Sequence, residues 1–83
     1  MTLKRFVYVL KTMVGEPRYY VGVTSDVQQR LLWHNQGRCT HTAKHRPWRT
    51  HVVLEFSDEP HAVRFEHYLK TGSGRAFAKR HFD

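Results

Sequence analysis

Residues 19–37 read YYVGVTSDVQQRLLWHNQG, and this stretch changes from strand-like to helix-like character within a few positions. Its first part, residues 19–23, is aromatic and β-branched, which is typical of a strand. Ser25 suits the N-cap of the following helix, a glutamine three residues later completes a capping box, and Asp26 favours the positive end of the helix dipole. Gly37 is placed to end this helix. We therefore expect a strand followed directly by a helix that begins at Ser25.

On the N-terminal side, residues 6–10 (FVYVL) are again β-branched and aromatic and predict another strand. Gly15 and Pro17 lie between the two strands and are typical of a turn. The two strands are close enough in the chain to form a hairpin.

On the C-terminal side, loop, strand and helix signals alternate. The expected elements are, in order, a loop over residues 38–49, a strand over residues 50–56, a helix from residues 57–60 to about residue 71, and a short helix over residues 75–82. Gly72 and Gly74 are placed to close the longer helix. The order β-β-α-β-α-(α) predicts a single α+β domain over residues 1–83, with a small three-stranded, mostly antiparallel sheet flanked by helices.

The composition excludes several classes of protein. The 83 residues are 40% hydrophobic and 13% aromatic, which is enough for one compact core and argues against disorder. No apolar run approaches the roughly 20 residues of a membrane span, and the start of the chain lacks the pattern of a signal peptide. Cys39 is the one cysteine, which excludes an internal disulfide and favours a cytoplasmic location.

The charge is strongly basic, with 14 Lys and Arg against seven Asp and Glu and a net charge of +7. The excess lies in two stretches without any acid, one between Asp26 and Glu55 and one between Glu66 and Asp83. Such stretches attract polyanions, of which nucleic acid is the usual one. The basic residues that we expect to bind DNA are Arg38, Lys44, Arg46, Arg49, Lys70, Arg75, Lys79 and Arg80.

Two helices carry polar residues where apolar ones would be expected. At 100° per residue, Glu66 falls inside the apolar stripe of its helix, where a carboxylate is costly unless it is paired or binds a metal. Helical periodicity alone leaves open whether Glu66 is an ion-pair partner, a metal ligand or an acid–base group. In the preceding helix, Arg30 and His34 lie one turn apart beside the buried face. They could point along the sheet together or form a solvated flank.

Each of the first two strands carries a tyrosine of interest. Tyr8 shares a face with Phe6 and Leu10, and Tyr20 shares a face with Gly22. A glycine inside a strand often marks the close approach of another group. The strand pattern by itself is compatible with two ordinary core tyrosines.

The combination of these fragments resembles the GIY-YIG nuclease domain in its small stand-alone form, over nearly the whole chain. Residues 6–8 (FVY) and 20–22 (YVG) are similar to the two half-motifs of that family. The run from Gly22 to Arg30, followed by His34 to Gly37, resembles its first helix. Residues 62–66 (AVRFE) resemble the segment that carries its metal-binding glutamate.

The resemblance implies a metal-dependent endonuclease that hydrolyses phosphodiester bonds in DNA, with a role in DNA repair. By this similarity, Glu66 would hold one Mg²⁺ or Mn²⁺ ion, and Arg30 would hold the scissile phosphate. Tyr8 would act as general base toward the attacking water, and Tyr20 and His34 would position that water and pass protons.

The chain departs from the family pattern in its first half-motif and after Glu66. Phe6 and Val7 stand where the half-motif has glycine and isoleucine, and no asparagine follows Glu66, although many family nucleases carry one. Ser73 or Arg75 could take the place of that asparagine. Two other functions therefore remain open: a DNA-binding module with little or no catalysis, and a subunit that is active only with a protein partner, which would also supply substrate specificity.

Overall fold

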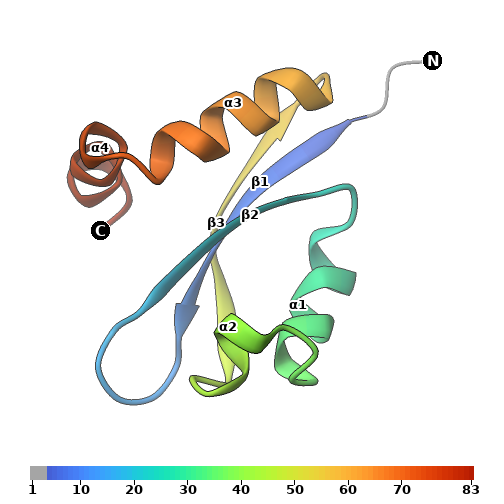
Figure 1. Cartoon of the computed structure of the whole chain (residues 1–83), viewed down its shortest axis with the longest axis vertical. Coiled ribbons are helices and arrows are strands. Elements are labelled where there is room, and N and C mark those ends of the chain that lie inside the picture. The colour runs from blue at the N-terminus through green and yellow to red at the C-terminus, as the bar shows by residue number, and fades with distance from the viewer. Residues whose placement is uncertain (1–3) are drawn as a thin grey trace.

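The computed structural model describes residues 4–83; residues 1–3, which the predicted domain includes, lie outside the described residues. A three-stranded sheet crosses the middle of the molecule, with helices on both of its faces (Figure 1). The elements are β1 (Arg5–Thr12), β2 (Tyr19–Thr24), α1 (Val27–Asn35), α2 (Thr40–Ala43), β3 (Trp48–Phe56), α3 (Glu59–Leu69) and α4 (Gly72–Phe82). The predicted α+β class and element order are confirmed, with α2 as an additional short helix. No helix within residues 4–83 has the length and apolar character needed to cross a membrane.

The sheet has the order β2-β1-β3, and both pairs of strands are antiparallel. Strand β1 is therefore central, and β2 lies at one edge of the sheet. Tyr8 on β1 is paired with Gly22 on β2. Between Val9 and Leu10 the pairing of β1 with β3 skips His51, so His51 is the extra residue of a β-bulge.

Strand alternation divides the core into two parts. On one face of the sheet, Val7 and Val9 pack with Ala62 and Leu69 of α3, and the apolar side chains of α4 join them. On the other face, Tyr8, Leu10 and Trp48 form a second cluster, against which Tyr20, Val27 and Leu31 pack. The sheet thus separates the α3 and α4 layer from the layer of α1 and α2.

The start of α1 differs from the prediction by one residue. Asp26, and not Ser25, is the N-cap, and its Oδ1 accepts a hydrogen bond of 3.1 Å from the backbone N–H of Gln29. The Thr24 hydroxyl accepts a hydrogen bond from the backbone N–H of Asp26, which fixes the turn from β2 into the helix. The capping-box prediction at Ser25 was therefore wrong, because a threonine hydroxyl from the preceding strand already holds this turn.

The predicted loop over residues 38–49 contains the four-residue helix α2 and the first two residues of β3. Tertiary contacts hold both. The indole N–H of Trp48 donates to the Thr42 carbonyl at 2.8 Å, and the Asn35 side chain accepts from the Trp48 backbone N–H at 2.7 Å. Strand β3 therefore begins at Trp48, two residues before the predicted start.

The predicted role of Gly72 and Gly74 as a helix stop was wrong. Both lie in the first turn of α4, whose N-cap Thr71 accepts a hydrogen bond from the Gly74 N–H at 3.1 Å. A Cβ atom on Gly74 would lie only 1.7 Å from the Tyr68 carbonyl oxygen. Glycine is needed here because the end of α3 packs directly against the start of α4.

Candidate functional site

The Tyr8 hydroxyl lies 2.9 Å from Nε2 of His34, and both side chains are buried. Tyr8 comes from the central strand and His34 from the last turn of α1, so this hydrogen bond joins the sheet to the helix. Gly22 on the neighbouring strand provides the space, since a Cβ atom there would lie 2.5 Å from the Tyr8 hydroxyl oxygen. His34 is therefore no solvated flank, and the glycine in β2 does mark a close approach.

The second nitrogen of His34 has a partner of its own. Nδ1 lies 2.8 Å from the Thr42 hydroxyl on α2, and that hydroxyl donates to the Cys39 carbonyl. Both ring nitrogens of His34 therefore have a hydroxyl partner, one on β1 and one on α2. The short helix α2 thus holds the His34 ring through one side chain.

Tyr20 lies beside this pair and is half-buried. Its ring packs edge-on against the His34 ring at a centroid distance of 4.8 Å, and its centroid lies 6.3 Å from that of Tyr8. Burial raises the pKa of Tyr20, and burial together with Tyr20 raises the pKa of Tyr8. Both phenols are therefore neutral at physiological pH.

Arg30 adds a positive charge near Tyr8 and His34. Its guanidinium carbon lies 4.8 Å from the centroid of the Trp33 ring, and it makes no ion pair with a carboxylate of residues 4–83. Burial and the charge of Arg30 lower the pKa of His34, and the same charge opposes the rise in the pKa of Tyr8. Arg30 is thus close enough to influence both residues electrostatically, and its charge is available to a phosphate.

Glu66 faces inward from α3 and is 9% exposed. Lys70 pairs with one of its carboxylate oxygens, and His67 Nε2 lies 3.7 Å from the other. The negative charge of Glu66 contributes to raising the pKa of both Tyr8 and Tyr20, which places it within electrostatic reach of the tyrosines.

The surroundings of Glu66 suit a divalent metal that needs only one carboxylate ligand from the protein. The partners of Glu66 are two exposed side chains, which a cation could displace. Within residues 4–83 no three His, Cys, Asp or Glu side chains gather to form a complete ligand set. Mg²⁺ suits a single carboxylate because it keeps several waters and takes further ligands from phosphate oxygens, whereas a structural zinc needs about four protein ligands.

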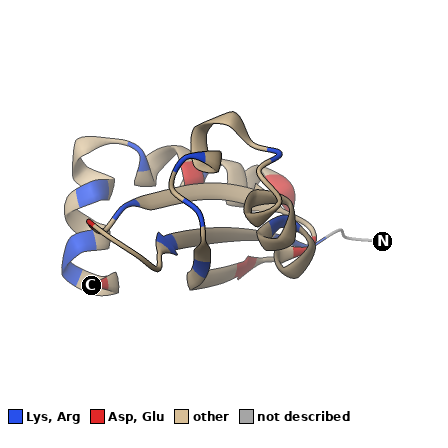
Figure 2. Cartoon of the chain, turned by 90° about the horizontal axis from the view of Figure 1, so that it is seen from below, with Lys and Arg blue, Asp and Glu red and all other residues tan. Residues whose placement is uncertain are grey.

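The eight basic residues predicted to bind DNA are all exposed, and they divide by position. Figure 2 shows Lys and Arg on α4 and on the chain around α2. Arg38, Lys44 and Arg46 flank α2, and Arg49 lies in β3 opposite Lys11. Of the remaining four, Lys70 directly follows α3. The other three, Arg75, Lys79 and Arg80, belong to α4.

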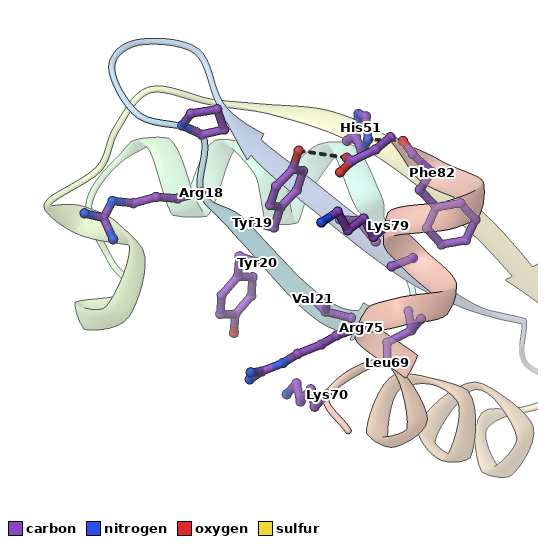
Figure 3. Close-up of a pocket in the computed structure, with 14 residues that line it drawn as sticks. Arg18, Tyr19, Tyr20, Val21, His51, Leu69, Lys70, Arg75, Lys79 and Phe82 are labelled. Carbon is purple, nitrogen blue, oxygen red and sulfur yellow. Dashed lines mark hydrogen bonds between the residues drawn. The ribbon is translucent and has the colours of Figure 1, made fainter. Parts of the chain in front are cut away.

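A cavity of about 740 Å³ lies between β2, the end of α3 and α4, and we call it the β2–α4 groove (Figure 3). Tyr20, Lys70, Arg75 and Lys79 line it, whereas Arg80 does not. Of the two predicted substitutes for the missing asparagine, Arg75 lines the groove beside Lys70, and Ser73 does not.

Sequence reasoning missed three residues of this region. Thr42 contacts Nδ1 of His34, and Arg18 and Tyr19 line the β2–α4 groove. Thr42 gave no signal because it lies eight positions after His34, in a segment without periodicity. Arg18 and Tyr19 lie at the start of the edge strand β2. They were missed because the strand pattern alone does not show that α4 packs against one face of β2.

Comparisons with known proteins identify the family of this chain. The GIY-YIG catalytic domain matches residues 4–80. A UPF0213 protein of Bacillus pumilus (strain SAFR-032) is 34% identical over 67 residues, which cover 80% of this chain and 66% of the relative, so the match spans slightly less than two thirds of that protein. The solution NMR structure of a UPF0213 protein from Bacillus halodurans is 28% identical, covers 93% of this chain and 81% of that one, and has a TM-score of 0.54. The chain belongs to the GIY-YIG family, whose members are generally nucleases.

Proposed function

We propose that this protein is a metal-dependent endonuclease that hydrolyses phosphodiester bonds in DNA. The observation that carries the proposal is the buried hydrogen bond between Tyr8 and His34, with the charges of Arg30 and Glu66 in reach of it. A protein that only binds DNA needs cations at its surface. It has no need of a buried phenol–imidazole pair within electrostatic reach of an inward-facing carboxylate.

Tyr8 and His34 act together as the proton acceptor. The raised pKa of Tyr8 makes its phenolate scarce at neutral pH, so Tyr8 cannot act as a preformed base. It takes the proton of the attacking water while its own hydroxyl proton moves to Nε2 of His34. The lowered pKa of His34 keeps Nε2 unprotonated and able to accept at physiological pH. In this transfer the N–H at Nδ1 of His34 donates to the Thr42 hydroxyl, which leaves Nε2 as the acceptor.

The other residues have supporting roles. Arg30 binds the scissile phosphate and offsets the negative charge that develops in the transition state, for which its planar guanidinium is suited. Tyr20, the more exposed of the two tyrosines, orients the water. Glu66 would hold Mg²⁺ or Mn²⁺, which when bound would stabilise charge on the leaving oxygen.

The test is cleavage of plasmid, single-stranded and branched DNA by the purified protein, with Mg²⁺, with Mn²⁺ and with EDTA. Glu66→Gln keeps the shape of the side chain but removes its charge, and we expect it to abolish metal-dependent cleavage while DNA binding persists. Glu59→Gln is the matched control, because Glu59 lies at the start of the same helix and pairs only with Arg5 among the described residues. We expect Glu59→Gln to cleave at the wild-type rate.

Two outcomes would overturn the proposal. If the wild-type protein binds DNA but cleaves none of these substrates with either metal, it is a binding module or a subunit that needs a partner. If Glu66→Gln lowers the melting temperature by as much as a buried ion-pair loss would, Glu66 is a structural partner of Lys70. We expect a small change instead, because the glutamine amide fills the same space and the exposed Lys70 ammonium stays in contact with solvent.

A further inference from the structure

The β2–α4 groove combines an apolar floor with a basic rim. Val9 and Val21 of the sheet and Leu69, Ala78 and Phe82 of the helices form its apolar part. Its volume of about 740 Å³ lies within the roughly 300–1,000 Å³ of typical small-ligand sites. A concave apolar surface of this size suits a flat, mostly apolar group.

The charges around the groove are mostly positive. Arg18, Arg75 and Lys79 are exposed and make no ion pair within residues 4–83. Lys70 also lines the groove, and its ammonium group pairs with Glu66. The one acidic residue in the lining, Asp83, accepts a hydrogen bond of 2.8 Å from the Tyr19 hydroxyl on its side-chain carboxylate. The rim therefore presents three unpaired cations, which suits an occupant with negative charge.

The aromatic side chain at the sheet side of the groove is held in place. Tyr19 is 45% exposed, yet its hydroxyl is bonded to Asp83 and its ring packs against His51 at a centroid distance of 5.7 Å. His51 is the bulged residue of β3, and its Nε2 lies 2.6 Å from the Phe82 carbonyl oxygen, which ties the end of α4 to the sheet. Figure 3 shows Tyr19 and His51 near the end of α4, with Arg75 and Lys70 toward the end of α3. A fixed, exposed ring loses little freedom when another ring stacks on it.

We propose that this groove binds the base of an unpaired nucleotide next to the scissile phosphate, so that the nuclease acts on unpaired DNA strands in preference to continuous duplex. Aromatic stacking beside cations is the way single strands are bound without sequence preference. In a duplex both faces of a base are stacked on neighbouring bases, so a paired base cannot enter the groove without being unstacked and flipped out, which costs energy.

The groove and the proposed reactive centre share two residues. Tyr20 lines the groove and packs against His34, and Lys70 lines the groove and pairs with Glu66. A nucleotide in the groove would therefore be a chain neighbour of the phosphate at the reactive centre. This inference rests on the proposed function for the position of the scissile bond, but the binding of an unpaired base can be tested without cleavage.

The experiment measures affinity by fluorescence anisotropy in EDTA, so that no metal-dependent cleavage occurs. The probes are a labelled single-stranded oligonucleotide and the same sequence as a duplex. Tyr19→Leu keeps an apolar side chain but removes the ring, and we expect single-strand affinity to fall at least about five-fold, with duplex affinity unchanged. Tyr19→Phe keeps the ring and its packing on His51 but loses the bond to Asp83, and it should bind the single strand several-fold more tightly than Tyr19→Leu does.

A second pair of variants tests the rim. Lys79→Gln should weaken single-strand binding and reduce the slope of log K against log salt by about one unit. Arg80→Gln removes the same charge one position later on α4, outside the groove, and should bind the single strand several-fold more tightly than Lys79→Gln does. Melting curves of all four variants verify that each is folded.

The results separate the two proposals. If the wild type prefers the single strand and Tyr19→Leu loses that preference, the groove binds a base even if no DNA is ever cleaved. If duplex binds as tightly as the single strand, or if Tyr19→Leu and Lys79→Gln bind the single strand as the wild type does, the inference is wrong. If the variants bind the single strand as the wild type does, the groove binds another class of occupant, such as a protein segment.

Discussion

The Tyr8 hydroxyl and Nε2 of His34 form a buried hydrogen bond of 2.9 Å between residues 26 positions apart in the chain. Tyr8 is 1% exposed and His34 is fully buried, so bulk solvent does not compete for this hydrogen bond. Gly22 provides the space for the hydroxyl, and Thr42 fixes the orientation of the imidazole. Four residues on four different elements therefore determine the position of this hydrogen bond.

Gly22→Ala tests the packing of this pair. The added Cβ would lie 2.5 Å from the Tyr8 hydroxyl oxygen, so the tyrosine must move, and we expect a loss of about 1–3 kcal/mol in stability together with lost cleavage. Gly72→Ala is the control, because a Cβ there meets nothing within 4 Å and should stabilise α4 by about 0.4–1 kcal/mol. Urea unfolding measures both. Equal free energies of unfolding for the two variants would contradict the close approach of the Tyr8 hydroxyl to Gly22.

The pH dependence of stability follows from His34. Burial and Arg30 lower its pKa in the folded protein below the ordinary value of about 6.5. Between these two values the unfolded chain binds more protons than the folded one, so the contribution of His34 to stability is complete above pH 6.5 and falls as the pH drops toward the folded pKa. NMR titration of the imidazole measures this pKa. A value at or above 6.5 would be incompatible with the environment described.

The pH dependence of cleavage follows from the same group. His34 must be neutral to accept the proton of Tyr8, so the single-turnover rate should rise with pH through the folded pKa of His34 and level off before pH 7. A rate that instead continues to rise steeply toward pH 10 would mean that a free phenolate is the base.

Arg30→Lys tests the role of the guanidinium. The charge is kept, but the planar fork and its stacking on Trp33 are lost, and we expect the cleavage rate to fall by about 10²-fold or more with little change in DNA affinity. Arg38→Lys makes the same change at an exposed position beyond the end of α1 and should leave the rate unchanged. Equal rates for Arg30→Lys and the wild type would remove Arg30 from the mechanism.

Local patterns in the sequence were sufficient for the element order and for the inward position of Glu66, since strand alternation and helical periodicity are properties of each segment alone. They were not sufficient for Gly74. A glycine after a helix usually ends it, and only the packing of α3 on α4 shows that Gly74 begins the next helix.

The partner of His34 on α2 illustrates the same limit within the candidate site. The spacing of Arg30 and His34 indicated that they act on one side of α1, but both a solvated and a buried position agreed with it. His34 is buried because α2 covers it. Thr42 and Trp48 hold α2 there through side-chain contacts that no periodicity reveals.

The most direct test of the account is the single-turnover cleavage rate of Tyr8→Phe beside that of Tyr20→Phe, each with saturating Mg²⁺. Tyr8→Phe removes one hydroxyl and leaves Nε2 of His34 without its donor, which should cost about 1–3 kcal/mol in stability. We expect Tyr8→Phe to lower the rate by about 10²–10⁴-fold with DNA affinity retained, and Tyr20→Phe to cost less. A Tyr8→Phe variant that cleaves at the wild-type rate, or a larger loss in Tyr20→Phe, would contradict the assignment of Tyr8 as the base.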